Sequence, residues 1–217
     1  MSSSFPNGTV FSLATSYAAT KTVTAISNAT TAVASSVSHG YSAGDIVILG
    51  NSSRLDQRVI RVAANAAPTD LFNLEGIDTS STTLYPSGFG VGTASKVTSF
   101  TAISQVTDVQ SAGGEQQFYQ WVYLEDGRQR QRPTFKNARS MTLVMDYDPD
   151  LAWHDDLIAA DLAGTVYVLK ASLPSGAVIY YSVYVGFDGE PSFTINENQK
   201  TVLSVSLACP TSTRYAA

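Results

Sequence analysis

The sequence is poor in cysteine, histidine and charge. It has one cysteine, Cys209, and two histidines among 217 residues. A single cysteine cannot form an internal disulfide, and these three residues are too few for a convincing zinc site. Lys, Arg, Asp and Glu make up 14% of the chain, against about 25% in an ordinary soluble domain. We therefore expect a folded surface that carries unusually little charge.

Long apolar runs and targeting segments are also lacking. The longest apolar run, residues 177–187, is too short to cross a bilayer, so no membrane insertion is expected. The first nine residues lack the basic and apolar regions of a secretion signal, which predicts folding in a reducing cytoplasm. The net charge of −5 argues against a protein that grips nucleic acid, although it is compatible with an acidic passage.

Short β-like runs, by contrast, fill the first half of the chain. Hydrophobic residues make up 44% of the sequence, enough for a core. Strands are predicted at residues 22–26, 32–37, 45–49, 58–63 and 70–74, each bounded by Gly, Asn, Asp or Pro. Five short strands so close together favour a small barrel or sandwich.

Longer strands are predicted in the second half, at residues 96–109, 116–124, 140–147, 165–173, 177–187 and 201–209. The Gly113-Gly114 pair between the first two indicates a hairpin turn. One helix is predicted at residues 149–163, because Asp148 suits the N-cap and Gly164 is a natural stop. The residues expected on or beside its buried face are Leu151, Ile158 and Leu162, with Trp153 and Leu157.

The connection at residues 125–139 is long and holds five of the 13 basic residues. Connections of this length are usually functional or disordered. It is either a solvated hairpin tip or an arm that contacts another molecule. In an extended arm, the alternating arginines would share one side. The candidate contact residues are Arg128, Arg130, Arg132, Phe135 and Lys136.

Six of the 18 acidic residues surround the predicted helix. Complementary charge on two separate patches suits head-to-tail assembly, but the same charges could pair within one subunit. The acidic patch consists of Asp146, Asp148, Asp150, Asp155, Asp156 and Asp161.

No constellation in the sequence supports catalysis or a bound cofactor. The Asp-x-Asp-x-Asp run at 146–150 opens like a calcium loop, but Leu151 replaces the required Gly and Leu157 the required Glu. His154, Asp155 and Asp156 are adjacent on the predicted helix and so diverge. The nucleophile-elbow, phosphate-loop and zinc-protease motifs are absent from the sequence. We expect neither an enzyme nor a metal or cofactor site.

Several segments of the second half have a distinctive order and spacing. They are AISQV at 102–106, GGEQQ at 113–117, LED at 124–126, ARSMTL at 138–143, DP at 148–149, ASLPSG at 171–176 and RYAA at 214–217. In the order and spacing of these segments, together with a first strand near residues 9–18, the chain resembles the major tail tube protein of long-tailed, siphovirus-type bacteriophages.

Residues 20–95 resemble a small β module of phage structural proteins. The segments are VSHG at 37–40, AGDIV at 43–47, LFNL at 71–74 and GID at 76–78. The sequence departs from the module after Leu55, where Asp56-Gln57 replaces Asn-Gly. This departure puts the local turn in doubt.

The resemblance implies a mainly β fold: a tail-tube-type β-sandwich or barrel with one short flanking α-helix, plus an inserted small β-barrel-like module. Residues 1–19 would form an N-terminal arm and first strand, residues 20–97 the inserted module, and residues 98–217 the tube domain.

The resemblance also implies a structural virion protein without catalytic residues. Hexameric rings of such proteins stack into a tube through which DNA is ejected without specific binding, and the loop at 125–138 would reach the adjacent ring. The implied partners are further copies of the chain, a tape-measure protein, and terminator and tail-tip proteins. The implied locations are the virion tail and, during assembly, the host cytoplasm.

A different class of function remains open on the residues alone. Small β modules with tyrosine-rich faces suit binding, and the chain has 11 tyrosines. The alternative is a tail-tip or fibre module that binds a host surface ligand.

Overall fold

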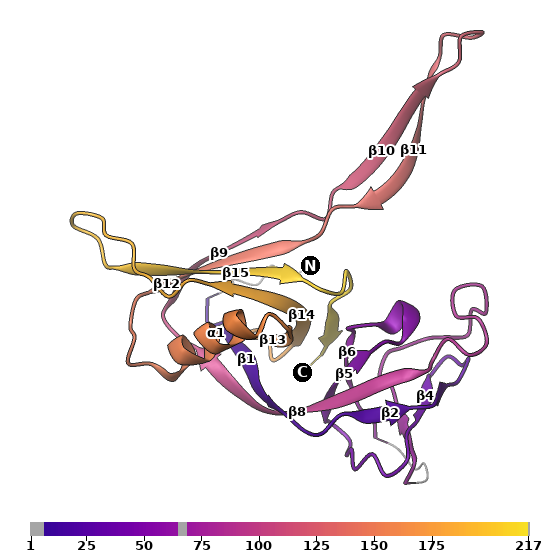
Figure 1. Cartoon of the computed structure of the whole chain (residues 1–217), viewed down its shortest axis with the longest axis horizontal. Coiled ribbons are helices and arrows are strands. Elements are labelled where there is room, and N and C mark those ends of the chain that lie inside the picture. The colour runs from indigo at the N-terminus through magenta and orange to yellow at the C-terminus, as the bar shows by residue number, and fades with distance from the viewer. Residues whose placement is uncertain (1–6, 65–68, 217) are drawn as a thin grey trace.

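Strands dominate the computed structural model, which describes residues 7–64 and 69–216 (Figure 1). The strands are β1 Val10–Tyr17, β2 Lys21–Val23, β3 Ala25–Ile26, β4 Val33–Ser35, β5 Ile46–Gly50, β6 Val59–Arg61, β7 Leu71–Asn73, β8 Gly92–Ile103, β9 Val106–Ala112, β10 Gln116–Val122, β11 Gln129–Lys136, β12 Ser140–Asp146, β13 Val166–Ser172, β14 Val178–Phe187, β15 Lys200–Leu207 and β16 Thr213–Tyr215. The described helices are α1, Ala152–Ala163, and a short 3₁₀ turn, Ser53–Leu55.

An eleven-stranded antiparallel sheet forms the body of the protein. Its order is β6-β5-β8-β1-β13-β14-β15-β12-β9, with β16 paired to β14 and β2 paired to β8. Figure 1 shows the sheet curling into a half-barrel, with α1 lying against it. The fold is therefore mainly β with one short helix, as the sequence predicts.

The long strand β8 belongs to both halves of this sheet. Its first residues pair with β2 and β5, and its last residues pair with β1. A separate three-stranded sheet, β3-β4-β7, lies in the first half of the chain. The short strands predicted at 32–74 thus exist, distributed over two sheets, whereas the strand predicted at 22–26 is divided into β2 and β3, which belong to different sheets.

Two large apolar cores follow the same division. One core is made by residues of β1 and of the chain from Ile103, the last residue of β8, onward, with α1 packed on it through Trp153 and Leu157. The second core consists of residues between Val23 and Ala94. A third, smaller cluster around Tyr180 and Tyr215 joins residues from both halves.

The strand predicted at 96–109 is wrong as a single element. The chain breaks at Ser104-Gln105, and Gln105 has a φ of 60°. Its carbonyl accepts a hydrogen bond from the backbone of Asp146, and Ser104 accepts one from the Trp153 indole. These bonds stabilise a sharp change of direction, so β9 pairs with β12 on the far side of the half-barrel.

The hairpin turn predicted at Gly113-Gly114 is also wrong, because β9 and β10 do not pair with each other. The two glycines instead mark the point where the chain leaves the main sheet. Gly113 has a φ of 81°, and a Cβ there would lie 2.0 Å from the Ala138 carbonyl oxygen. This crowding requires glycine at the exit.

The helix begins later than predicted, at Ala152, and Asp148 is not its N-cap. The Asp148 carboxylate accepts a hydrogen bond from the backbone of Asp150, closing a local turn in place of capping the helix. The predicted stop at Gly164 is confirmed, with left-handed geometry. The predicted face is wrong at Leu162, which is 81% exposed; the buried helix residues are Trp153, His154, Leu157 and Ala160.

Candidate assembly surfaces

Strands β10 and β11 form an arm that projects from the body (Figure 1). We use "arm" for residues 115–137. The predicted loop at 125–138 is therefore largely an ordered strand, and its turn lies at residues 123–128. The two strands pair only with each other among the described residues. An isolated two-stranded ribbon is marginally stable in water, so contact with another molecule would stabilise the arm.

One face of the arm carries a ladder of aromatic and basic side chains. Trp121 stacks on Tyr119 with ring centroids 5.8 Å apart and meets Tyr123 edge-on. Tyr119 lies opposite Arg132 and Trp121 opposite Arg130, so these side chains share a face. The predicted one-sided arrangement thus holds for Arg130 and Arg132, whereas Arg128 precedes the strand.

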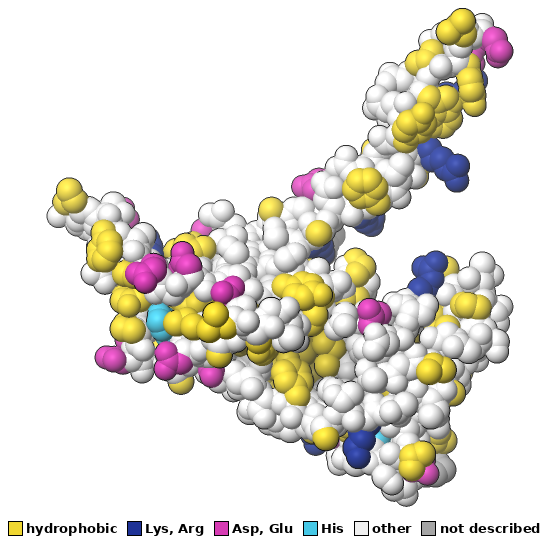
Figure 2. Space-filling model, in the orientation of Figure 1, with side chains coloured by type: hydrophobic (Ala, Val, Ile, Leu, Met, Phe, Trp, Pro, Cys, Tyr) yellow, Lys and Arg dark blue, Asp and Glu magenta, His cyan; other side chains and the backbone are white. Residues whose placement is uncertain are grey.

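The arm also exposes large apolar side chains. The exposed members are Phe118, Tyr119, Val122, Tyr123, Leu124 and Phe135. Figure 2 shows these groups gathered along the arm beside basic side chains. Contiguous exposed apolar surface of this kind marks an interaction site.

One arginine of the arm is paired with a carboxylate of the arm itself. Arg130 forms an ion pair with Asp126, and its guanidinium lies 4.6 Å from the centre of the Tyr123 ring. The predicted contact residues Arg128, Arg132 and Lys136 are in no ion pair within the described residues. These three cations are available to a partner.

Figure 2 shows acidic side chains over the part of the molecule that contains α1. Of the six acids of the predicted patch, three lie on α1 and three lie at the end of β12 and in the turn before α1. Asp155 has 91% of its side chain exposed. Three others accept hydrogen bonds within the subunit: Asp146 from the Asn198 amide, Asp148 from the Gln105 amide, and Asp161 from the Phe187 backbone. No ion pair joins the patch to the arm within the described part of the subunit.

Strand β9 is an unpaired edge of the main sheet. Its residues from Thr107 to Ala112 are exposed. Edge strands present free backbone donors and acceptors and can add a strand from another chain. This edge was not predicted from the sequence, because residues 96–109, which form β8 and β9, were predicted as a single strand.

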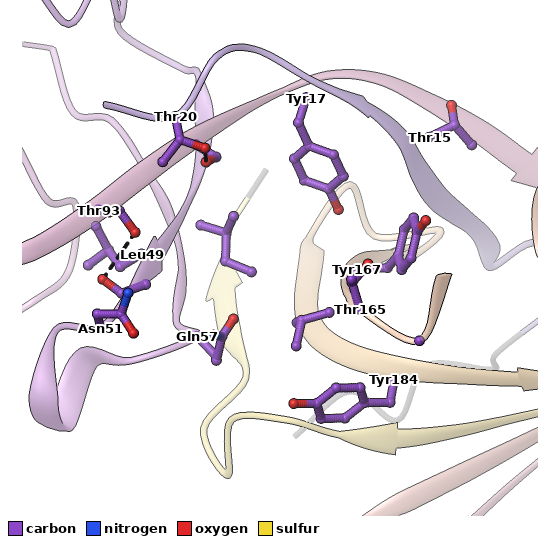
Figure 3. Close-up of a pocket in the computed structure, with 15 residues that line it drawn as sticks. Thr15, Tyr17, Thr20, Leu49, Asn51, Gln57, Thr93, Thr165, Tyr167 and Tyr184 are labelled. Atoms are coloured by element: carbon purple, nitrogen blue, oxygen red, sulfur yellow. Dashed lines mark hydrogen bonds between the residues drawn. The ribbon is translucent and has the colours of Figure 1, made fainter. Parts of the chain in front are cut away.

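A second feature that the sequence analysis missed is a cleft of about 580 Å³ between the two halves of the sheet (Figure 3). Hydroxyl and amide side chains line it, including Asn51, Gln57 and Thr165, together with Tyr167 and Tyr184. No lining side chain is charged, so the cleft offers hydrogen bonds and no acid–base pair.

Tyr17 closes one wall of this cleft. Its hydroxyl accepts a hydrogen bond from the Val168 backbone, and burial raises its pKa to about 12. The phenol therefore stays neutral and holds β1 against β13. The role of Tyr17 is positional.

The C-terminal strand β16 fastens the two halves together. Tyr215 accepts a hydrogen bond from the Arg61 backbone at 2.6 Å, and Thr213 donates one to the Val59 carbonyl at 2.6 Å. The Arg61 guanidinium covers the Tyr215 ring at 4.3 Å and forms a two-point ion pair with Glu75. We call these contacts the β16 clasp; they connect β6 to β14 through β16.

We expect Glu75→Gln to weaken the clasp at neutral pH by about 1 kcal/mol or less, because both side chains are partly exposed and the pair is screened. The hydrogen bonds from Arg61 lower the pKa of Glu75 below its usual value of 4.5. The stabilisation is therefore present above pH 4.5 and is lost as the pH falls through the lowered pKa. Denaturant unfolding between pH 7 and pH 3 measures the difference from wild type, which should shrink on acidification. A difference independent of pH would contradict this assignment.

Neither a cluster of metal ligands nor a membrane-spanning helix is found in residues 7–64 and 69–216. No three His, Cys, Asp or Glu side chains lie close enough there to hold a metal ion. No helix in the same ranges has the length and apolar character needed to cross a bilayer. Cys209 is buried and unpaired.

A comparison with models of protein families identifies the family of the chain. The model of the phage tail tube protein family, TTP, matches residues 50–217, more than half of the chain. The chain belongs to the phage tail tube protein family. It is therefore a structural, non-enzymatic component of the tail of a phage or phage-like particle.

Two solved structures are distantly similar to the chain. The tail tube chain is 12% identical to a chain in the virion of a native gene transfer agent particle, with a TM-score of 0.41, covering 54% of this chain and 89% of that one. It is 19% identical to a chain in the tube-terminating cap of the anti-feeding prophage, with a TM-score of 0.35, covering 54% and 83%. No curated protein matches.

Proposed function

We propose that the protein assembles into hexameric rings that stack into the tail tube of a siphovirus-type phage or a related particle, and that DNA passes through the lumen. The single observation that carries this proposal is that the chain, a member of the tail tube family, has an arm whose two strands pair only with each other in the described part of the subunit. An assembled tube supplies the arm with a partner.

The arm is proposed to contact the adjacent ring. The exposed cations Arg128, Arg132 and Lys136 supply charge, and exposed Phe135 supplies apolar area. Arg130 already forms an ion pair with Asp126. We propose that this pair fixes the orientation of the arm face that carries Arg130 and Arg132. The acidic patch around α1 is proposed either to receive a neighbouring arm or to line the lumen. Like charge between wall and phosphate would let DNA slide without sticking.

Lateral contacts within a ring are proposed to use the edge of β9. Pairing of this edge with a neighbouring copy would satisfy its free backbone groups and continue the sheet around the ring. A hexamer in which every sheet meets the next would have no open edge at this position.

Residues 20–97 are proposed to be an inserted module, flanked by the tube segments 1–19 and 98–217. The separate apolar core between Val23 and Ala94 supports this division. The module shares β8 with the body and is held by the β16 clasp. The proposed further partners are a tape-measure protein, a terminator and a tip complex.

Negative-stain microscopy of the purified chain over a range of concentrations tests the proposed function. We expect rings or tubes to appear as the protein concentration rises, because the proposed contacts, between arm and acidic patch and between β9 and a neighbouring sheet, join copies of the same chain. Sedimentation at the same concentrations gives the assembled fraction. Monodisperse monomers at the highest concentration, with neither rings nor tubes, would contradict the proposal.

A further inference from the structure

The loop between β14 and β15, residues 188–199, is a small structured projection, which we call the tip loop. Ser192 donates backbone and side-chain hydrogen bonds to the Lys200 carbonyl at 2.8 and 3.1 Å, and Glu197 donates one to Thr194. Its base lies against α1: the Gly189 carbonyl oxygen is 3.4 Å from His154 Nε2, and a Cβ added at Gly189 would lie 3.2 Å from Ile158. The tip loop is therefore held away from the body as a short hairpin.

The tip loop presents apolar groups surrounded by acids. Phe193 is 78% exposed and Ile195 is 89% exposed. Asp188, Glu190 and Glu197 are exposed and form no ion pair within the described residues. Figure 2 shows apolar side chains at the end of the molecule opposite the arm. Nothing in the described subunit covers this apolar tip.

A cleft at the foot of the arm has the complementary character. We call it the arm-base cleft; it measures about 450 Å³ and is lined by Gly113, Gly114, Lys136, Asn137, Ala138, Arg139, Leu207, Ala208 and Pro210. Its lining contains two cations and no carboxylate, and neither cation forms an ion pair among the described residues. The one carboxylate that hydrogen-bonds to the lining is Glu115, held by the Asn137 amide.

The tip loop and the arm-base cleft lie at opposite ends of the same strand pair. In the antiparallel pair β12–β15, Asp146 faces Lys200 at the tip-loop end, and Ser140 faces Ser206 at the cleft end. Eight residues of β15 separate the two surfaces, roughly 25 Å at about 3.3 Å per residue. They are too far apart to meet within one subunit, but a second copy displaced along the strands brings them together.

We propose that the tip loop of one copy inserts into the arm-base cleft of the next copy, head to tail. Phe193 and Ile195 would contact the apolar wall made by Ala138, Leu207 and Pro210. Glu190 and Glu197 would pair with Lys136 and Arg139. Such a contact is heterologous, so it propagates along an axis. It rests on the proposed self-assembly and adds a contact that does not involve the aromatic face of the arm.

Charge reversal tests this pairing. The loop variant is Glu190→Lys with Glu197→Lys, and the cleft variant is Lys136→Glu with Arg139→Glu. Each alone should raise the critical concentration for tubes by about tenfold or more, the factor equal to ~1.4 kcal/mol. The four changes combined in one chain should restore assembly, since the charges are again opposite. Sedimentation and microscopy give the critical concentration.

A second pair of changes covers the case in which charge reversal disturbs folding. Phe193→Ser with Ile195→Ser removes exposed groups outside the core and should also block tubes, with an unchanged thermal melt. Val37→Ser with Val91→Ser, which removes exposed apolar groups elsewhere, is the matched control and should assemble normally.

The outcomes separate the two proposals. Tubes from every loop and cleft variant at the wild-type concentration would overturn the contact and leave the tail-tube function standing. Loss of assembly without rescue by the combined variant would overturn the direct pairing of the two surfaces. Failure of the wild type to assemble would overturn both.

Discussion

Replacing Tyr119, Trp121 and Tyr123 with serine should leave the protein folded and prevent tube formation. The three rings form one ladder on the arm, outside both large cores. Buried aromatic residues at interfaces commonly contribute 2 kcal/mol or more each. We therefore expect the critical concentration to rise at least ~100-fold, measured by sedimentation and electron microscopy. The thermal melt of the body should not change.

The opposite face of the arm provides the control. Phe118 and Val122 are also exposed, and Phe118 lies opposite Pro133 on the other side of the ribbon. If the aromatic ladder is the docking face, Phe118→Ser with Val122→Ser should have a clearly smaller effect. Normal tubes from the aromatic variant would rule out docking through the face that bears Tyr119, Trp121 and Tyr123.

Replacing Arg128, Arg130 and Arg132 with serine should also weaken the stacking of rings more than the folding of the subunit, because exposed charges contribute little to stability.

Leu157→Ala should destabilise the monomer by about 2–5 kcal/mol, the usual cost of truncating a buried leucine. Leu157 is fully buried between α1 and the main sheet. Denaturant unfolding followed by circular dichroism measures the loss. Because the helix and sheet form one core, the transition of the whole body should move to lower denaturant.

The matched control lies on the same helix. Leu162 is 81% exposed, so Leu162→Ala should change the free energy of unfolding by no more than about 0.5 kcal/mol. Equal effects of the two substitutions would mean that α1 packs through the face containing Leu162. The observed packing through Trp153 and Leu157 would then be incorrect.

The sequence predicted strands well wherever one side of the strand faces a core. β5 alternates between buried and half-buried residues from Val47 onward, and β12 alternates strictly along its length. This period of two is visible in the sequence itself. The helix stop at Gly164 was visible for a similarly local reason, since a left-handed C-cap favours glycine.

Predictions failed where a tertiary contact decides the local structure. Nothing at Ser104-Gln105 looks like a break, because Gln105 is neither glycine nor proline yet has a positive φ. Its geometry depends on bonds to Asp146 and Trp153, more than forty residues away. Likewise, β11 has no buried face, so its sequence carries no alternation to mark it as a strand.

The candidate surfaces were predictable only in part. The cations of the arm and the acids around α1 are clustered in the sequence, so composition along the chain located both. The arm-base cleft and the charge-free cleft are assembled from segments far apart in the chain. Only the pairing of β12 with β15 brings Arg139 beside Leu207. No local pattern encodes that proximity.

The positions of the two tryptophans give the protein separate optical reporters. The chain has two tryptophans: Trp121 on the arm, and Trp153 on the buried face of α1. Docking of the arm would change the emission of the first, whereas unfolding of the body would change that of the second. With Trp153→Phe or Trp121→Phe, one fluorimeter could follow polymerisation and denaturation independently. The kinetics of tube growth would then be accessible without a label.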